Sequence, residues 1–371
     1  MKPNERIDHA IDTAAERSEA FVSFIARSWR PIAGGAAALF VLSIAILWMT
    51  VYRPFAGKAE PQISAPSETA ASSTGLYRLL DGVEVADASS TRLLPLGVMV
   101  ENSSEAWPLA GVAKANVVFE APVEGSITRF FLLFDPSTDS GDIGPVRSAR
   151  PYYVDIADAF HALYAHVGGS PEALDRMKAM DGFKNFDEYY NGSFFRRVSS
   201  RAAPHNVMTD VAKLTMGAEK KSWSAEEFAS WVYADAATGT ASIDTRTIRI
   251  PYDGAYEASW VFDAETGTYT RHQNGRVQKD ADGAVVRAKN VVVMAADATV
   301  LDDVGRLRVR TTGSGEVVIA HDGAVVRGRW TRKDGENFRF ITTEGNDIAL
   351  ARGKTWVSII TSSADFDSVL E

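Results

Sequence analysis

The stretch PYYVDIADAFHALYAHVGG, residues 151–169, contains two different elements in succession. Proline at position 151 suits the first turn of a helix, and helical spacing then places apolar side chains on one face, namely Tyr153, Ile156, Ala157, Phe160 and Leu163. The run LYAHVGG, residues 163–169, predicts a buried strand that ends at two glycines. A helix followed directly by such a strand is typical of an α/β fold.

The same alternation continues on both sides of this stretch. Strands are predicted within LPLGVMVEN, ANVVFEAPVEG and ITRFFLLFD, residues 94–102, 115–125 and 127–135. Helices are predicted in residues 170–180 with Ser170 as N-cap, in 209–214 with Thr209 as N-cap, and in 224–234 behind a capping box of Ser224 and Glu227. We therefore predict an α/β domain over residues 76–235.

From residue 236 onward the pattern changes to short strands separated by Gly, Asp and Asn turns. Examples are TRTIRIPY, ASWVFD, KNVVVMA, EVVIAHDG and TWVSIIT, which begin at residues 245, 258, 289, 316 and 355. This pattern predicts a β-rich (α+β) C-terminal domain over residues 236–371. Because large cores are usually divided between domains, we expect this region to fold as a separate unit.

A long apolar run precedes the α/β domain. Residues 31–52 contain no charge and are long enough to cross a bilayer as one helix, and Trp48 and Tyr52 suit the membrane interface. The run could instead be a buried core helix or a cleaved signal peptide, but signal peptides usually have a shorter apolar region. We predict a single transmembrane helix here, between an amphipathic arm (1–30) and an Ala-, Ser- and Pro-rich linker (53–75).

A short N-terminal arm is easily kept inside the cell while a long domain is translocated. We therefore expect a single-pass protein of the cell membrane with a cytoplasmic N-terminus and most of the chain extracytoplasmic. The net charge of −9 and the lack of a basic run argue against nucleic acid as a partner. The absence of cysteine excludes disulfides, thiolate metal sites, a cysteine nucleophile and a lipid-modified cysteine.

The candidate site centres on Arg147 and Arg150, which come just before a predicted helix N-terminus, where backbone N–H groups and the helix dipole favour an anion. The turn at Gly168 and Gly169 leads into a second helix start. Such strand-to-helix turns gather at one edge of an α/β sheet. The predicted ligand-binding residues are Glu124, Arg129, Arg147, Arg150, His166, Gly168, Gly169, Ser170, His205 and Asn206.

Four segments resemble successive motifs of the YerB-like family of bacterial envelope proteins: EAPVEGSITRFFLLF, IGPVRSARPYYVD, YAHVGGSPEALD and APHNVMT, beginning at residues 120, 143, 164 and 203. The region 268–293, with GRWTRKDGENFRF (328–340), resembles the companion C-terminal domain of that family. The resemblance implies a two-part extracytoplasmic module of unsettled biochemical role, with support of cell-wall synthesis as one expectation. The predicted transmembrane helix replaces the lipid-modified cysteine that is common in the family.

Several hypotheses compete with the anion site. Ser170 with His166 or His205 could form a nucleophile and its base, although an N-cap role explains the serine more simply. Glu120 and Glu124 could form a carboxylate pair for glycan cleavage. Two histidines with Glu124 lack local metal-ligand spacing, so we expect no metal and no cofactor. Finally, the arginines at 129, 147 and 150 could form internal ion pairs with Glu120, Glu124 or Asp155.

These observations favour a membrane-anchored binding or accessory protein of the cell envelope over an enzyme, and they assign no catalytic residue. The expected partners are the membrane through residues 31–52, an anionic or cell-wall ligand, and an envelope protein at the C-terminal domain. The competing function is a hydrolase that acts on cell-wall glycan or peptide.

Overall fold

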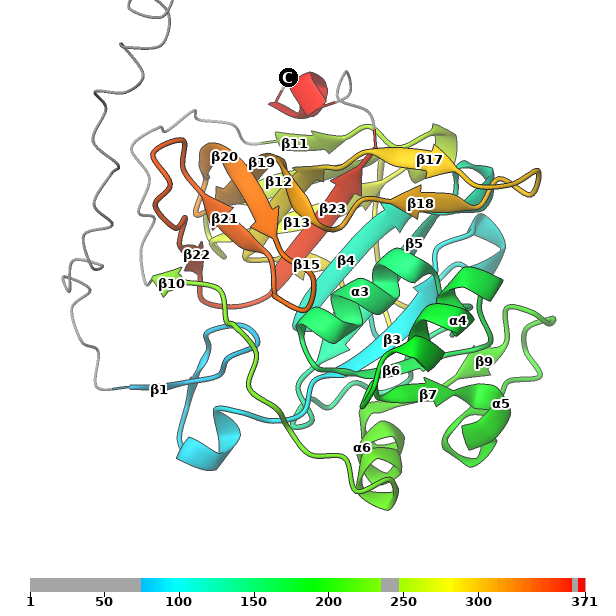
Figure 1. Ribbon diagram of the computed structural model, residues 1–371. Helices are drawn as coiled ribbons and strands as arrows, with labels where there is room; N and C mark the ends of the chain where they lie inside the picture. Colours follow the sequence, from blue (N-terminus) through cyan, green and yellow to red (C-terminus); the bar gives the residue numbers. More distant parts are fainter. Residues whose placement is uncertain (1–74, 235–246, 362–365, 371) are drawn as a thin grey trace, which may run out of the picture. The chain divides into compact units, whose positions relative to one another are not determined.

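A mixed sheet of ten strands forms the centre of the fold, in the order β21-β20-β19-β16-β23-β4-β5-β3-β6-β7 (Figure 1). Its first half in sequence comprises β3 (Leu96–Glu101), β4 (Val117–Pro122), β5 (Thr128–Phe134), β6 (Leu163–His166) and β7 (Asn185–Asp187). The other half comprises β16 (Asn290–Ala295), β19 (Gly313–His321), β20 (Ala324–Arg332), β21 (Arg339–Ile341) and β23 (Thr355–Ile360).

The computed structural model describes residues 75–234, 247–361 and 366–370. The predicted arm (1–30), the predicted transmembrane helix (31–52) and nearly all of the predicted linker (53–75) lie outside the described residues. Within the described ranges, no helix combines the length and the apolar character that crossing a bilayer requires.

The β5 strand illustrates why the sheet has a hydrophobic layer on each face. Its side chains alternate between the two faces: Phe130 and Leu132 belong to one buried cluster, whereas Phe131 and Leu133 belong to the other. Strands buried on both faces read as continuous apolar runs, as RFFLLF does.

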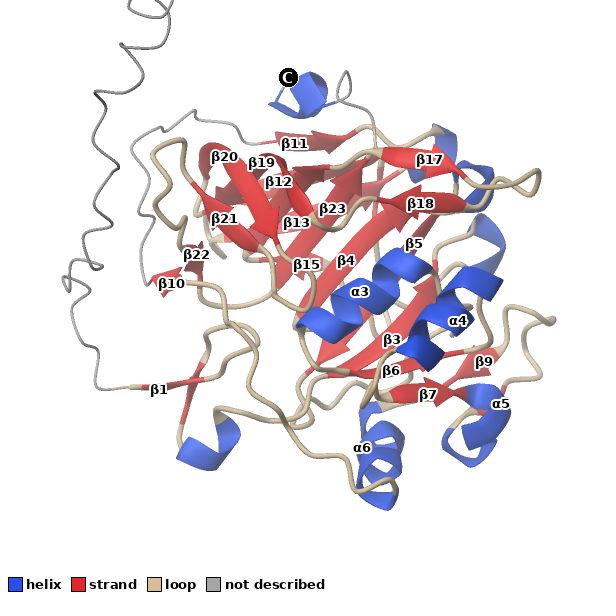
Figure 2. Cartoon of the chain, viewed as in Figure 1, coloured by secondary structure: helices blue, strands red, loops and turns tan. Residues whose placement is uncertain are grey.

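Two helices, α3 (Pro151–Ala159) and α4 (Pro171–Ala179), cover one face of the sheet (Figure 2). The other face packs against a five-stranded sheet of β11 (Thr247–Ile250), β12 (Ala258–Asp263), β13 (Thr268–Gln273), β14 (Arg276–Val277) and β15 (Arg287–Ala288). Trp260 of the small sheet meets Trp356 of β23 with ring centroids 5.1 Å apart. Large aromatic rings thus fill the space between the two sheets.

The remaining elements are one helix of ten residues and several short helices and strands. The other helices are α5 (Glu188–Asn191), α6 (Val211–Lys220) and the 3-10 turns η2 (Ala88–Ser90), η3 (Ser104–Ala106), η4 (Glu124–Ser126), η5 (Gly192–Phe194), η6 (Gly254–Tyr256) and η7 (Asp367–Leu370). The other strands pair as β1 (Leu76–Tyr77) with β2 (Glu84–Val85), β8 (Arg196–Arg197) with β9 (Val207–Met208), β10 (Tyr233–Ala234) with β22 (Leu350–Ala351), and β17 (Ala298–Val300) with β18 (Leu307–Val309).

Two of the helix predictions need correction. The N-cap of α6 is Asp210, whose side chain accepts from the Lys213 amide, and Thr209 lies one residue earlier. The helix predicted for residues 224–234 does not form. There, Trp231 is buried and its indole N–H donates to the carbonyl of Phe338 at 3.0 Å. Aromatic packing against the sheet therefore outweighs the local capping signal.

The expectation that the C-terminal region has a core of its own is wrong. Strand β23 is parallel to both of its neighbours, so that Val357 pairs with Val292 of β16 on one side and with Phe119 of β4 on the other. Both hydrophobic clusters also contain residues from each half of the sequence. The division of the sequence between residues 235 and 236 stays a prediction. The regions on its two sides both contribute strands to the central sheet.

Candidate functional site

The segment that carries the two site arginines crosses the ends of β3 and β6. The Arg147 amide donates to the carbonyl of Met99 at 2.9 Å, and the Val167 amide donates to the carbonyl of Arg147 at 3.1 Å. Ala149 then forms a parallel bridge with Gly169. These backbone bonds bring the two predicted strand-to-helix turns together at one edge of the sheet.

Arg150 forms an internal ion pair. Its Nε and Nη2 atoms each donate to an oxygen of Glu124 at 2.7 Å, and both side chains are largely buried. Burial alone would raise the pKa of the Glu124 carboxyl, but the hydrogen bonds and charge of Arg150 outweigh burial, and the pKa is lowered. This bidentate pair ties η4 to the N-terminus of α3, so Arg150 has the structural partner that the ion-pair hypothesis predicts.

Arg129 is the exception in the cluster. Its side chain is buried and its Nη1 donates to the carbonyl of Ser148 at 2.8 Å. Among the described residues, no carboxylate oxygen lies within 4.0 Å of its guanidinium. Burial, together with repulsion from Arg150 and Arg147, lowers its pKa to about 10. Three cations therefore meet at this edge, and the nearest carboxylates, Glu124 and Glu101, pair with Arg150 and Arg147 and leave Arg129 without a partner of opposite charge within 4.0 Å among the described residues.

Arg147 is partly paired. Its Nη1 donates to the carbonyl of Pro204 at 3.1 Å, and its Nε lies 3.5 Å from Glu101 without forming a hydrogen bond. The same Glu101 carboxylate contacts His205 Nδ1 at 2.7 Å, while the other ring nitrogen of His205 contacts Glu105 at 3.1 Å. The APHNV segment is therefore joined to the arginine segment through Glu101, which the sequence analysis did not include.

The structure gives Ser170 the N-cap role that competed with the nucleophile hypothesis. The serine is buried and caps α4, where its Oγ accepts from the Ala173 amide at 3.3 Å. His166 is also buried, with Nδ1 donating to the carbonyl of Gly168 at 2.7 Å and Nε2 in contact with Asn185 Oδ1 at 2.8 Å. Burial lowers the pKa of His166. Both residues fix the turn into α4, which passes through Gly168 in a left-handed conformation at φ +57°.

The two carboxylates considered for glycan cleavage belong to different networks, because Glu120 pairs with Arg271 and Glu124 with Arg150. Asp155 contacts Arg176 instead of the three site arginines. The Asn206 side chain accepts from Arg197 at an exposed position of the β8–β9 hairpin. In the part of the chain that the structure describes, no three His, Asp or Glu side chains are grouped for a metal ion.

One member of the cluster was missed from sequence. The Tyr164 hydroxyl is fully buried, and its O–H has no acceptor among the described residues. Burial raises its pKa, while the Arg150 backbone N–H and the charges of Arg129 and Arg150 oppose that rise. A hydroxyl whose O–H has no acceptor, beside the charge of Arg129, adds a donor to the cluster. Its sequence signal was weak, because Tyr164 reads as an ordinary core residue of the LYAH strand.

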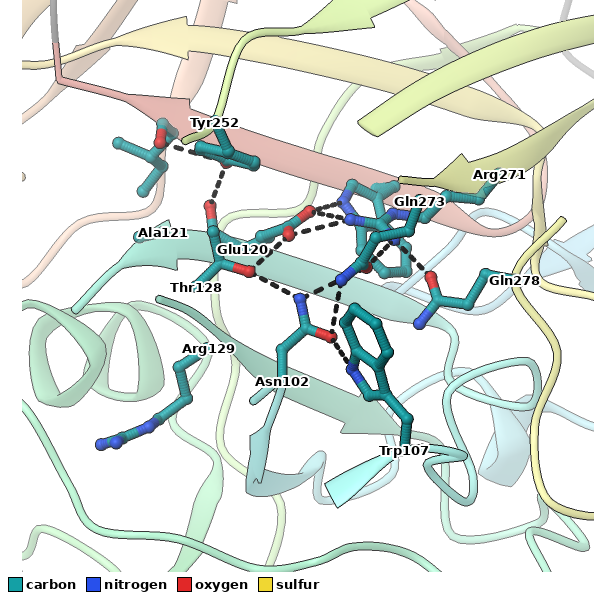
Figure 3. A network of polar contacts seen from close by, with 12 residues as sticks. Asn102, Trp107, Glu120, Ala121, Thr128, Arg129, Tyr252, Arg271, Gln273 and Gln278 are labelled. Carbon is teal, nitrogen blue, oxygen red and sulfur yellow. Dashed lines mark hydrogen bonds and ion pairs between the residues drawn. The ribbon is translucent and has the colours of Figure 1, made fainter. Parts of the chain in front are cut away.

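A second polar network lies between the two sheets (Figure 3). Glu120 of β4 receives two bonds of 2.9 Å from Arg271 Nη2, one from Thr128 at 2.8 Å and one from the Trp356 indole at 3.2 Å. The Arg271 guanidinium also lies over the ring of Trp356, 4.7 Å from its centroid. Sequence reasoning missed this pair because its members are 151 residues apart.

The sequence matches one family over both regions. Residues 80–224 match the family described as "Protein of unknown function (DUF3048) N-terminal domain", and residues 248–357 match its C-terminal domain. The chain belongs to this family of two-domain, β-rich mixed α/β proteins, and the resemblance to YerB-like proteins is confirmed.

A sequence comparison and a structural comparison, both with YerB from Bacillus subtilis, describe the similarity. A protein of strain 168 described as "Putative lipoprotein YerB" is 28% identical over 277 residues, which cover 73% of this chain and 82% of that protein. The crystal structure of YerB protein from the same species superposes with a TM-score of 0.69 at 26% identity, covering 77% of this chain and 97% of the other.

Proposed function

We propose that this chain is a membrane-anchored, extracytoplasmic accessory protein of the cell envelope that binds an anionic group of an envelope ligand at Arg129, Arg147 and Arg150. The description of the similar Bacillus protein as a lipoprotein supports attachment to a membrane. Here residues 31–52 would supply the anchor as a transmembrane helix, since the chain has no cysteine to carry a lipid.

The observation that carries the anion site is the buried, uncompensated charge of Arg129. Leaving a buried charge without a counterion is costly, and the two neighbouring arginines increase that cost by repulsion. A bound carboxylate or phosphate would compensate the charge, and the rigid guanidinium fork suits both groups. The buried hydroxyl of Tyr164 would be a further donor.

Within this cluster the three arginines have different roles. Arg150 is held by Glu124, so it positions the turn and the start of α3. Arg147 is the most exposed of the three, with 21% of its side chain accessible, and it lies between the cluster and the loop around Pro204. It is therefore the residue best placed to reach a ligand from solvent. A binding role has more support than hydrolysis because Ser170, Glu120 and Glu124 are all engaged in structural contacts.

The test is a calorimetric titration of the full-length protein with inorganic phosphate and, separately, with acetate. We expect saturable binding that Arg147→Ala weakens by about 1.5 to 3 kcal/mol, the value of a charge-assisted hydrogen bond. The same variant should change the free energy of unfolding by no more than about 0.5 kcal/mol, as substitutions on the surface usually do. Lys221→Ala, which removes an exposed cation at the C-cap of α6, is the matched control. Unchanged binding in Arg147→Ala would reject the site, and a large loss of stability would assign Arg147 to the fold.

A further inference from the structure

A separate cavity lies beside the Glu120–Arg271 network, at the β13–β14 hairpin. Its volume is about 340 Å³, within the range of small-molecule sites. One wall is apolar and is formed by Trp107, Pro108 and Leu109; the other comes from the hairpin, residues 273–279. None of the three site arginines lines this cavity, so it is distinct from the anion cluster.

The hairpin that forms the polar wall has a defined geometry. Its turn residues, Asn274 and Gly275, both have positive φ, at 50° and 69°, as a tight two-residue turn requires. Gln273 and Arg276 are paired directly across the two strands, so their side chains lie on the same face. Both residues line the cavity, so this face of the hairpin contributes to its wall.

The polar groups of the cavity are oriented by the buried network. Arg271 Nη1 donates to the side-chain oxygens of both Gln273 and Gln278 (Figure 3). In each amide the oxygen therefore faces Arg271 and the nitrogen points away from it. Gln273 Nε2 then donates to Asn102 Oδ1 at 3.3 Å. The Gln278 amide nitrogen has no hydrogen-bond partner among the described residues, so it is a free donor at the cavity wall.

The aromatic wall is equally fixed. The Trp107 indole N–H donates to Asn102 Oδ1 at 3.0 Å, and its ring meets the edge of Tyr256 with centroids 6.2 Å apart. The ring is only partly buried and lines the cavity. A held indole with one accessible side can stack against the C–H face of a sugar ring, while amide donors bind the hydroxyl edge.

The charge at the rim narrows the ligand class. Arg276 and Lys279 line the cavity and are exposed, and neither forms an ion pair among the described residues. On a chain with a net charge of −9, two such cations at one rim favour a ligand that carries an anionic group. We infer that this cavity binds a pyranose sugar bearing a carboxylate, with Trp107 stacking on the ring, Gln278 bonding a hydroxyl, and Arg276 and Lys279 contacting the carboxylate.

The inference does not depend on the anion cluster and can fail independently. The probe is sodium glucuronate, titrated by calorimetry into the full-length Arg147→Ala protein so that binding at the arginine cluster is weakened, with glucose as the ring without a carboxylate and acetate as the carboxylate without a ring. We expect glucuronate to bind more tightly than either control compound. The double variant Arg276→Ala with Lys279→Ala should weaken glucuronate binding about tenfold or more, since each charge-assisted bond to a carboxylate is strong.

Two further variants separate the parts of the site. Trp107→Phe keeps an aromatic ring but loses the bond to Asn102, and it should weaken glucuronate and glucose alike. Arg147→Ala should leave glucuronate binding at this cavity unchanged, whereas the rim double variant should leave phosphate binding at the arginine cluster unchanged. Equal affinities of glucuronate and acetate, or full glucuronate binding by the rim double variant, would overturn the inference. Because Arg276 and Lys279 are exposed, loss of folding does not confound that variant.

Discussion

The Arg271 guanidinium and the Glu120 carboxylate form an ion pair in which both side chains have no solvent exposure, and this pair joins β13 of the small sheet to β4 of the central sheet. Glu120 is in the N-terminal region and Arg271 is in the C-terminal region. The pair therefore fixes the two sequence regions to each other, and the network around it also orients the amides at the Trp107 cavity.

The first prediction concerns this pair. Glu120→Leu should lower the free energy of unfolding by about 3–5 kcal/mol, because it leaves the Arg271 charge buried without a counterion. The double variant Glu120→Leu with Arg271→Met should recover much of that loss, because no buried charge remains. Urea denaturation of the four proteins of this cycle measures the coupling.

An exposed pair in the same sheet provides the control. Arg249 and Glu257 are 2.9 Å apart, and each is about half exposed. Glu257→Gln should therefore cost less than about 1 kcal/mol. If Glu120→Leu were no more destabilising than Glu257→Gln, the buried pair would not be a main link between the sheets.

The second prediction concerns the independence of the C-terminal region. A fragment of residues 236–371 should lack a cooperative thermal transition, because β23 would lose its partner β4 and expose one edge of a strand that is buried throughout its length. Differential scanning calorimetry of the fragment and of the full-length protein gives the comparison. A sharp transition in the fragment would mean that β16, β19 and β23 form a sufficient core alone.

The third prediction concerns pH. Lys354 lies beside Trp356 and is partly buried, and desolvation of its ammonium group, with some repulsion from Arg271, lowers its pKa from 10.5 to about 7 against the attraction of Asp280. The unfolded chain therefore binds one more proton than the folded chain between about pH 7 and pH 10.5, so this residue makes stability rise with pH across that window.

Lys354→Met should remove this rise and should stabilise the protein at pH 7 and below, by up to several kcal/mol, since each pKa unit corresponds to about 1.4 kcal/mol. Lys114→Met, at an exposed lysine, is the control and should leave the pH profile unchanged. The measurement is the denaturant midpoint of each protein from pH 6 to pH 10. Parallel pH profiles for Lys354→Met and the parent protein would contradict the lowered pKa of Lys354.

The fourth prediction concerns Gly97 in β3. A methyl group at this position would lie 2.3 Å from the Phe131 ring and 3.0 Å from the carbonyl of Leu163. The ring is fully buried and cannot move freely, so Gly97→Ala should destabilise the fold by about 1–3 kcal/mol. Gly192→Ala has open space around it and a helical φ of −55°, so it should cost little. Thermal unfolding of both variants tests whether close packing explains the glycine in β3.

The sequence alone determined the elements whose signals are local. The apolar runs around Val98, Phe119 and Phe131 predicted three central strands, and Pro151 and Ser170 marked the starts of two helices, because strand burial and helix capping depend on neighbouring residues in the chain. The motifs that carry the family resemblance were equally readable. Arg147 and Arg150 could be placed near a helix start for the same reason.

Only the tertiary structure decided which side chains meet. Glu120 pairs with Arg271 instead of the site arginines, Arg129 has no carboxylate within 4.0 Å among the described residues, and β23 inserts between β16 and β4. Residues 224–234 stay non-helical because Trp231 packs on the sheet. In each case the deciding energy comes from contacts between residues far apart in sequence, through burial of aromatic surface and pairing of buried charge, and no local pattern encodes those contacts.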